Sequence, residues 1–404
     1  MIPSPAPVID HERLRRVDRF LDDLVDLGRV PGWAWSLVTA DGVAHTAGGG
    51  LRDIDRRLPV EPSTLFRIYS MTKPITAAAA MLLFERGLVQ LTDPIEEYLP
   101  EFASTPVYDG GNGDRMRVRP RTRPLTLGHA ITHTSGLTYG FHRSHPVDES
   151  YRSAGHDVEA PPGRSLAESC RTWASMPLLF EPGTAWNYSV GMDVVGRVIE
   201  VVSGRPLGEF IDAELFGPLG MTDTGFHVVE SARKRLAVVY RHCDGELAPD
   251  HQIGRSVLLT QSGHYGGGGL VGTLADYGQF AAMLLRTGTT GDGRRLLAPE
   301  TVRFMLRNHL PDGRDIASFG RPMSGELGFN GVGQALGATV VLDPATWQLR
   351  SPGEYAWGGI AGTYFWCSPV LGTAAIFMLQ VAPAGAVPIR GRLHQLVQQS
   401  LIIR

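Results

Sequence analysis

The stretch LFRIYSMTKPITAAAAMLLFERG, residues 65–87, carries the pattern that decides the fold. Residues 64–68 are typical of a short strand, and the apolar, Ala-rich run over 71–86, with a proline near its start, predicts a buried helix. Ser70 and Lys73 stand at the beginning of that helix in a Ser-x-x-Lys spacing. Side chains three positions apart lie on one helical face, so the lysine amine can reach the serine hydroxyl.

A serine and a lysine in this arrangement are suited to nucleophilic catalysis. A serine hydroxyl is a weak nucleophile because its proton must leave as it attacks, and it therefore needs a base within hydrogen-bonding reach. Lysine serves as that base when burial or a second cation lowers its pKa. The alternative for these residues alone is a helix N-cap at Ser70 followed by a solvated Lys73. The apolar composition of the helix favours the buried, catalytic interpretation.

A second polar group stands at the start of another predicted helix. Tyr188 follows the loop EPGTAW and precedes a helical pattern over residues 190–202. A phenol near an ammonium group sheds its proton more easily, so a tyrosine and a lysine can share the acid and base roles. Taken alone, a tyrosine at this place is more often a packing residue.

The segment YAWGGIAG, residues 355–362, interrupts a strand pattern with glycines. Interior glycines weaken a strand unless a ligand or another backbone approaches closely there. An acyl group lying along this strand could place its carbonyl oxygen between the backbone N–H groups of Ser70 and Ile360. The alternative is a β-bulge or a tight turn without a ligand.

Strand patterns at both ends of the chain, with helical patterns between them, predict an α+β fold with a split sheet. The patterns are an amphipathic helix over 14–27, a hairpin around Asp41-Gly42, a helix over 274–285, strands at 338–342, 354–365 and 373–381, and a closing helix over 394–401. We therefore expect residues 1–85 and 270–404 to form a sheet domain. Residues 86–269 would form a mostly helical domain that carries the Tyr188 loop.

Composition argues against several classes of protein. The chain has 404 residues, 43% of them hydrophobic and 20% charged, which is typical of a folded globular protein. Its net charge of −3 provides no basic surplus for nucleic acid or an anionic membrane. Neither a disulfide framework nor a metal site is indicated by the three dispersed cysteines or by the histidine spacings. No secretory signal or membrane span is visible, so we expect a cytoplasmic protein. We also expect that the protein needs no metal or organic cofactor.

Together, the three motifs resemble the serine β-lactamase and penicillin-binding-protein superfamily, in the class C-like branch that includes the family VIII carboxylesterases. The resemblance runs from about residue 33 to 381 and includes ITHTSGL at 131–137 and EPGTAWNYS at 181–189. It implies a β-lactamase/transpeptidase-like fold, an antiparallel sheet flanked by helices with a helical insertion domain. It also implies that Ser70 is acylated, that Lys73 activates it and that Tyr188 is the second proton carrier.

Two departures from the β-lactamase pattern bear on the substrate. Val190 stands where lactamases have the Asn of Tyr-x-Asn, and Trp357-Gly358-Gly359 stands where they have Lys-Thr-Gly. The missing cation and amide would hold the carboxylate and acylamide groups of a β-lactam. Trp357 offers an apolar face instead, as in the family VIII esterases, so we expect residues 357–359 to contact the substrate. The triplet Arg286-Thr287-Gly288 matches a cationic motif literally, but its pattern is that of a helix C-terminus.

The sequence therefore predicts a serine hydrolase that cleaves carboxylic esters of small to medium acyl chain through an acyl-enzyme on Ser70. A β-lactamase or a D-amino-acid-specific peptidase or amidase is an alternative in the same class. A non-catalytic acyl-binding sensor of the same fold is an alternative in another class. The run Gly266 to Gly269 is predicted to be a flexible turn, and His133 to order a loop. The expected partner is a small-molecule ester, and the sequence carries no signal for an oligomeric state.

Overall fold

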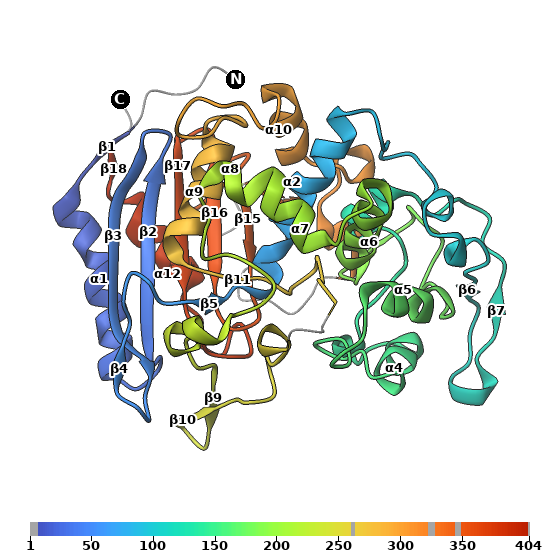
Figure 1. The fold of residues 1–404 in the computed structure, drawn as a ribbon, viewed down its shortest axis with the longest axis horizontal. Coiled ribbons are helices and arrows are strands. Elements are labelled where there is room, and N and C mark those ends of the chain that lie inside the picture. The colour runs from blue at the N-terminus through green and yellow to red at the C-terminus, as the bar shows by residue number, and fades with distance from the viewer. Residues whose placement is uncertain (1–6, 260–262, 322–327, 344–348, 403–404) are drawn as a thin grey trace.

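An eight-stranded antiparallel sheet is the centre of the computed structural model, which describes residues 7–259, 263–321, 328–343 and 349–402 (Figure 1). In spatial order its strands are β13 (Val332–Gln334), β14 (Thr339–Val341), β15 (Tyr355–Gly358), β16 (Tyr364–Ser368), β17 (Thr373–Met378), β2 (Gly32–Thr39), β3 (Gly42–Asp53) and β4 (Leu58–Pro59). Strand β17 pairs with β2, so that Phe377 lies opposite Trp35. The two ends of the chain therefore meet in the middle of one sheet, as the split pattern predicted.

The strand predictions are confirmed except in one place. The hairpin around Asp41-Gly42 joins β2 and β3. The pattern over residues 354–365, predicted as one strand, is instead the antiparallel pair β15 and β16 with a turn between them. The backbone N–H of Gly359 donates to the carbonyl of Thr363 across that turn, and Gly362 takes a positive φ of 87°. Glycine allows this conformation without strain, and the chain reverses there.

Both faces of the sheet are buried under helices. Along β2 the side chains alternate, and Trp35 and Leu37 pack with helices α1 (His11–Asp26) and α12 (Arg390–Gln398), whereas Ala34 and Val38 belong to the core on the opposite face. Helix α9 (Leu274–Leu285), predicted over the same residues, covers that opposite face, and the hydroxyl of its N-cap Thr273 accepts from the Asp276 N–H. Because both faces of the sheet are covered, every residue of β2 is buried.

Helix α2 (Thr72–Glu85) lies in the middle of the larger core, against helix α6 (Gly191–Ser203). Every residue from 72 to 83 is buried, which is why the sequence shows no polar stripe. A 3₁₀ turn over Tyr69–Met71 leads into α2 and carries Ser70.

The remaining helices are α3 (Leu127–Ile131), α4 (Pro146–Ser153), α5 (Leu166–Ala174), α7 (Leu207–Ile211), α8 (Gly217–Leu219), α10 (Pro299–Leu306) and α11 (Ile316–Phe319). The short strand pairs are β1 (Val8–Ile9) with β18 (Leu401–Ile402), β5 (Phe66–Arg67) with β11 (Val271–Gly272), β6 (Val107–Tyr108) with β7 (Val118–Arg119), β8 (Trp186–Asn187) with β12 (Gly320–Arg321), and β9 (Tyr240–Cys243) with β10 (Glu246–Pro249). In Figure 1, α4, α5, β6 and β7 lie to the right of the sheet, β9 and β10 lie at the bottom, and α10 lies near the top.

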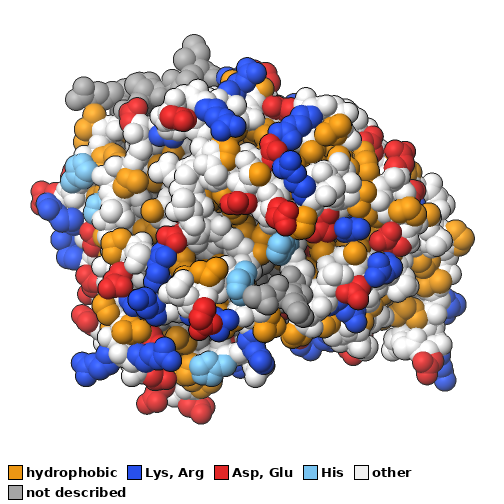
Figure 2. Space-filling view, viewed as in Figure 1, with side chains coloured by type: hydrophobic (Ala, Val, Ile, Leu, Met, Phe, Trp, Pro, Cys, Tyr) orange, Lys and Arg blue, Asp and Glu red, His pale blue; other side chains and the backbone are white. Residues whose placement is uncertain are grey.

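Acidic and basic side chains are interspersed over the face that Figure 2 shows, in agreement with the small net charge. Cys170, Cys243 and Cys367 are free thiols, of which Cys243 alone is exposed. Within the described ranges, no helix has the length and apolar character needed to cross a membrane.

Candidate active site

The segment that carries Ser70 is held in a constrained backbone conformation between α2 and the end of β15. Tyr69 has a φ of 45°, in the left-handed region that non-glycine residues rarely adopt. A side chain at Gly359 would stand 2.7 Å from the Ile68 carbonyl oxygen and 2.3 Å from Thr363 Oγ1. Glycine at 359 therefore lets the backbone before Ser70 approach the strand directly, one of the two reasons the sequence offered for glycines in this strand.

Three residues from separate segments meet at the Ser70 hydroxyl. The Lys73 amine lies 3.3 Å from Ser70 Oγ, one turn along as the spacing predicted. The Tyr188 hydroxyl, from the segment between β8 and α6, donates to Ser70 Oγ at 2.7 Å. The Lys73 Nζ also lies 4.5 Å from the centre of the Tyr188 ring. The serine hydroxyl is thus within proton-transfer distance of an amine and a phenol.

Burial sets the protonation of Lys73. The side chain is fully buried, and desolvation lowers the pKa of its ammonium to about 7, although the Asp193 carboxylate acts in the opposite direction. Its Nζ donates to the carbonyl oxygen of Gly267. A lysine with this pKa has a substantial neutral fraction near pH 7, so it can accept a proton.

Tyr188 is packed among aromatic side chains. Its ring centre lies 4.9 Å from His133, 5.1 Å from Tyr139 and 5.4 Å from Trp357. Burial raises the pKa of the Tyr188 phenol well above its usual value, and the hydrogen bond with Ser70 offsets this only in part. The expectation that the nearby ammonium would make this phenol easier to deprotonate is therefore outweighed by desolvation. Tyr188 is suited to donate a proton and Lys73 to accept one.

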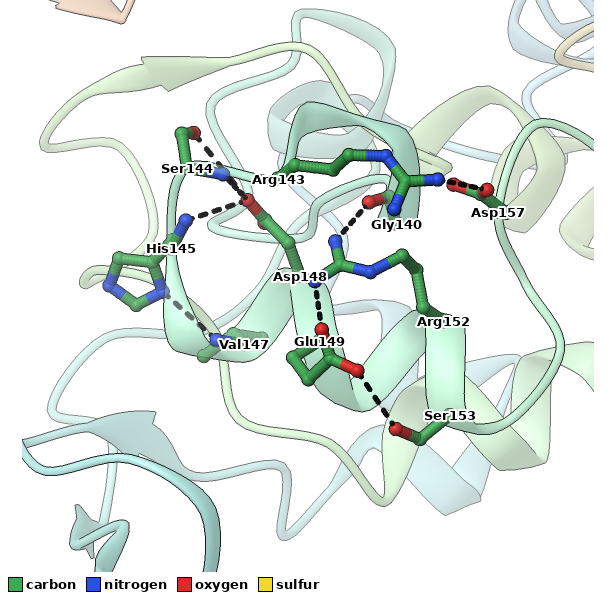
Figure 3. A network of polar contacts seen from close by, with 10 residues as sticks. All are labelled: Gly140, Arg143, Ser144, His145, Val147, Asp148, Glu149, Arg152, Ser153 and Asp157. Carbon is green, nitrogen blue, oxygen red and sulfur yellow. Dashed lines mark hydrogen bonds and ion pairs between the residues drawn. The ribbon is translucent and has the colours of Figure 1, made fainter.

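A polar network, drawn in part in Figure 3, surrounds the N-terminus of α4 next to these aromatic side chains. The buried Asp148 carboxylate accepts from the N–H groups of Ser144 and His145, at 3.0 and 2.9 Å, at the N-terminus of α4. Its other oxygen accepts from the Thr138 hydroxyl at 2.7 Å. Thr138 immediately precedes Tyr139 in the sequence. Asp148 thereby fixes the segment whose aromatic rings pack against Tyr188.

The backbone N–H groups of Ser70 and Ile360 have no hydrogen-bond acceptor among the described residues. Both residues line one cavity, together with residues 357–359. A side chain at Gly358 would stand 2.6 Å from the Arg390 guanidinium, so the missing side chain leaves room for that cation. The Trp357 indole N–H is buried, and its interaction with the Tyr188 phenol acts to lower the pKa of that phenol.

The cavity beside Ser70 has a volume of about 350 Å³. Aromatic side chains form much of its wall, namely Tyr139, Phe141, Trp173, Tyr265, Phe329 and Trp357. Such a lining binds apolar groups and excludes water. Among the described residues, no group of three His, Cys, Asp or Glu side chains could hold a metal ion.

Two contributors to the site, Asp193 and the backbone of Gly267, were not predicted from the sequence. The glycine run 266–269 does form a turn, but it is packed against α2 and α6 and supplies the carbonyl that binds Lys73. The one available signal for Asp193 was its position, three residues after Val190 in a largely apolar helix. His133 contacts the Ser189 hydroxyl at 3.3 Å, which agrees with the predicted role in ordering a loop.

Comparison with known proteins identifies the class. A family model described as Beta-lactamase matches residues 17–399. Esterase EstB of Burkholderia gladioli is 32% identical over 391 residues, covering 92% of this chain and 91% of that esterase. Protein Rv1367c of Mycobacterium tuberculosis is 37% identical over 339 residues, covering 83% of this chain and 82% of that protein.

A solved structure also resembles this chain. EstCE1, described as a hydrolase with promiscuous acyltransferase activity, superposes with a TM-score of 0.81 at 25% identity, over 96% of this chain and 99% of that one. The chain belongs to the beta-lactamase family. It is a serine hydrolase of the β-lactamase fold.

Proposed function

We propose that this protein is a carboxylesterase that works through an acyl-enzyme on Ser70. The observation that carries the proposal is the position of the Ser70 hydroxyl, between the Lys73 amine and the Tyr188 phenol, at the wall of an aromatic cavity. The similarity to Esterase EstB supports an ester as the substrate.

In acylation, Ser70 Oγ forms a bond to the ester carbonyl carbon while its proton passes to the Lys73 amine. The backbone N–H groups of Ser70 and Ile360 stabilise the resulting oxyanion. The bond from carbon to the alcohol oxygen then breaks, and Tyr188 gives its proton to the departing alcohol. The Lys73 ammonium returns a proton to the phenolate, and the acyl group remains on Ser70.

Deacylation follows the same route with water in place of the alcohol. Water attacks the acyl carbonyl carbon and loses a proton to the Lys73 amine. The serine oxygen regains a proton as the carboxylic acid leaves. A non-catalytic acyl-binding sensor would stop before this step. Release of acid in repeated turnovers therefore distinguishes the esterase from the sensor.

The substrate side of the site favours apolar esters of small to medium acyl chain. Trp357 and the aromatic wall offer apolar contact area at the strand where a lactamase pattern has a lysine. The residues at positions 190 and 357 also lack the amide and ammonium groups expected for a β-lactam. We therefore propose ester cleavage rather than β-lactam or D-peptide cleavage as the main activity.

The test compares the wild-type protein with the Ser70→Ala variant. Wild type should hydrolyse p-nitrophenyl butyrate and become labelled by a fluorophosphonate, with the adduct on the peptide that contains Ser70. The variant should do neither. Nitrocefin and a D-Ala-D-Ala peptide serve as competing substrates, and cleavage of either at a kcat/KM equal to that of the ester would overturn the proposed substrate class.

A further inference from the structure

We propose that Asp193 is a positioning residue for the reaction, which holds the Lys73 amine beside Ser70 through the backbone of Gly267 and balances its charge. The inference rests on the proposed function, because it assigns the group that prepares the base of that mechanism. Asp193 does not touch the reacting atoms.

The three residues form a continuous chain of hydrogen bonds. Asp193 lies in the first turn of α6 and is 4% exposed. Its Oδ1 accepts from the Gly267 N–H at 2.7 Å, and the Gly267 carbonyl oxygen accepts from Lys73 Nζ. The carboxylate therefore acts on the amine through one residue of intervening backbone, without a direct ion pair. Val190, three residues earlier, offers no polar side chain for this purpose.

The glycine at 267 is required by this arrangement. A side chain there would stand 2.6 Å from Asp193 Oδ2 and 2.9 Å from the Tyr139 hydroxyl. A side chain at the neighbouring Gly266 would stand 2.8 Å from the Met192 carbonyl oxygen. The glycine run is thus the surface on which the start of α6 packs, and this close packing explains a sequence feature that the proposed mechanism alone does not need.

Asp193 is also the charged partner of Lys73 in an otherwise neutral surrounding. Tyr139 and Tyr188 face the amine, and burial raises the pKa of both phenols, so both are neutral. Burial likewise lowers the pKa of His133 and leaves its ring neutral. Cys170 of α5 and Tyr265 lie near Asp193, and burial raises the pKa of each. None of these groups compensates the ammonium, whereas the Asp193 carboxylate does. Burial raises the pKa of this carboxyl group, and Lys73 and the Gly267 N–H act to lower it.

These surroundings determine the direction in which the Asp193 charge shifts the pKa of Lys73. Burial lowers the pKa of Lys73, and the negative charge of Asp193 works against that decrease. Asp193 therefore keeps the amine protonated to a higher pH than burial alone would allow. Removing only the charge should let Lys73 lose its proton at a lower pH.

The experiment follows the rate of fluorophosphonate labelling of Ser70 as a function of pH. In Asp193→Asn the amide oxygen still accepts from the Gly267 N–H, but the charge is absent. We expect the acid limb of the labelling rate to move about one pH unit lower. Asp193→Ala removes the acceptor as well, and labelling should become slower at every pH. Asp276→Asn, a buried carboxylate in α9 away from the site, is the matched control and should leave the limb in place.

A second pair of variants tests the same connection without changing the charge. Gly267→Ala should displace the carboxylate and slow labelling about 10²-fold. In Gly268→Ala the nearest atom to the new side chain would be 3.8 Å away, and the acid limb should stay at the wild-type pH. The comparison of Gly267→Ala with Gly268→Ala tests the role of Asp193 even if Asp193→Asn does not fold. An acid limb that is unmoved in Asp193→Asn, or that moves equally in Asp276→Asn, would overturn the proposal.

The readout separates this inference from the proposed function. Labelling reports the reactivity of Ser70 whether or not an ester is turned over. Failure of wild type to hydrolyse any ester, with labelling intact, would reject the esterase and leave the role of Asp193 open to the same measurement. A normal esterase with an unmoved acid limb in Asp193→Asn would reject only the role of Asp193.

Discussion

The hydroxyl of Tyr188 lies 2.7 Å from Ser70 Oγ, although 118 positions separate the two residues along the chain. This contact joins the segment before α6 to the segment before α2. Because these two helices pack against each other in the larger core, the contact is fixed by burial of apolar surface and does not depend on a flexible loop.

Replacing the phenol tests that contact directly. Tyr188→Phe removes one oxygen atom and leaves the buried ring, so the fold should persist while kcat/KM falls by about 10²- to 10⁴-fold. Steady-state kinetics with p-nitrophenyl butyrate and the thermal midpoint measure the two effects. Tyr151→Phe, at another fully buried tyrosine that does not line the cavity, should leave the rate near that of wild type. Equal losses in both variants would contradict the role of Tyr188.

The pH dependence of activity should follow the protonation of Lys73. The amine must be neutral to accept the serine proton, and burial lowers its pKa to about 7 from the usual value of 10.5. Activity should therefore rise with pH through neutrality and then level off. Lys73→Arg keeps the side chain charged at every pH and should be inactive throughout. A rate that does not change through neutral pH would argue against Lys73 as the base.

Gly359 should not tolerate a side chain. In Gly359→Ala the new methyl group would meet Thr363 Oγ1 and the Ile68 carbonyl oxygen, which pushes the Ser70 segment away from β15. We expect kcat/KM to fall about 10²-fold, because small misplacements of reacting groups have large effects on rate. The control is Gly278→Ala in α9, where the nearest atom is 3.7 Å from the new side chain. That helical substitution should stabilise the protein by about 0.5–1 kcal/mol.

The network in Figure 3 predicts two unequal effects on stability. Asp148 is 1% exposed and accepts three hydrogen bonds shorter than 3.1 Å, so Asp148→Ala should lower the free energy of unfolding by about 2–4 kcal/mol. The Arg143–Asp157 ion pair is largely exposed, with side chains 61% and 41% accessible. Arg143→Ala should cost less than about 1 kcal/mol. Urea unfolding followed by circular dichroism measures both, and similar losses would show that burial is not what distinguishes them.

The parts of the site that follow local rules were predictable from the sequence. The helical spacing of Ser70 and Lys73 places amine and hydroxyl on one face, whatever the rest of the fold. The turn at Asp41-Gly42 and the pattern over residues 373–381 predicted a hairpin and a strand that the structure confirms. These features depend on short stretches of chain, in which the side-chain pattern and the backbone geometry are directly linked.

The parts that were missed depend on tertiary contacts. Asp193 acts on Lys73 through the backbone of Gly267, which lies 74 positions further along the chain, and a backbone carbonyl leaves no sequence signature. The pattern over 354–365 looked continuous because its turn contains apolar residues as well as glycines. The raised pKa of the Tyr188 phenol depends on how deeply the ring is buried, and only the packed structure shows that burial.

The pairing of β17 with β2 has a consequence for biosynthesis. Translation produces β2 (Gly32–Thr39) long before its neighbour β17 (Thr373–Met378). Until then the sheet stays open on one edge, and α9 has no complete surface on which to dock. The surroundings of Ser70 are therefore complete only once the segment through residue 378 has been synthesised, and such pairing between distant segments slows folding.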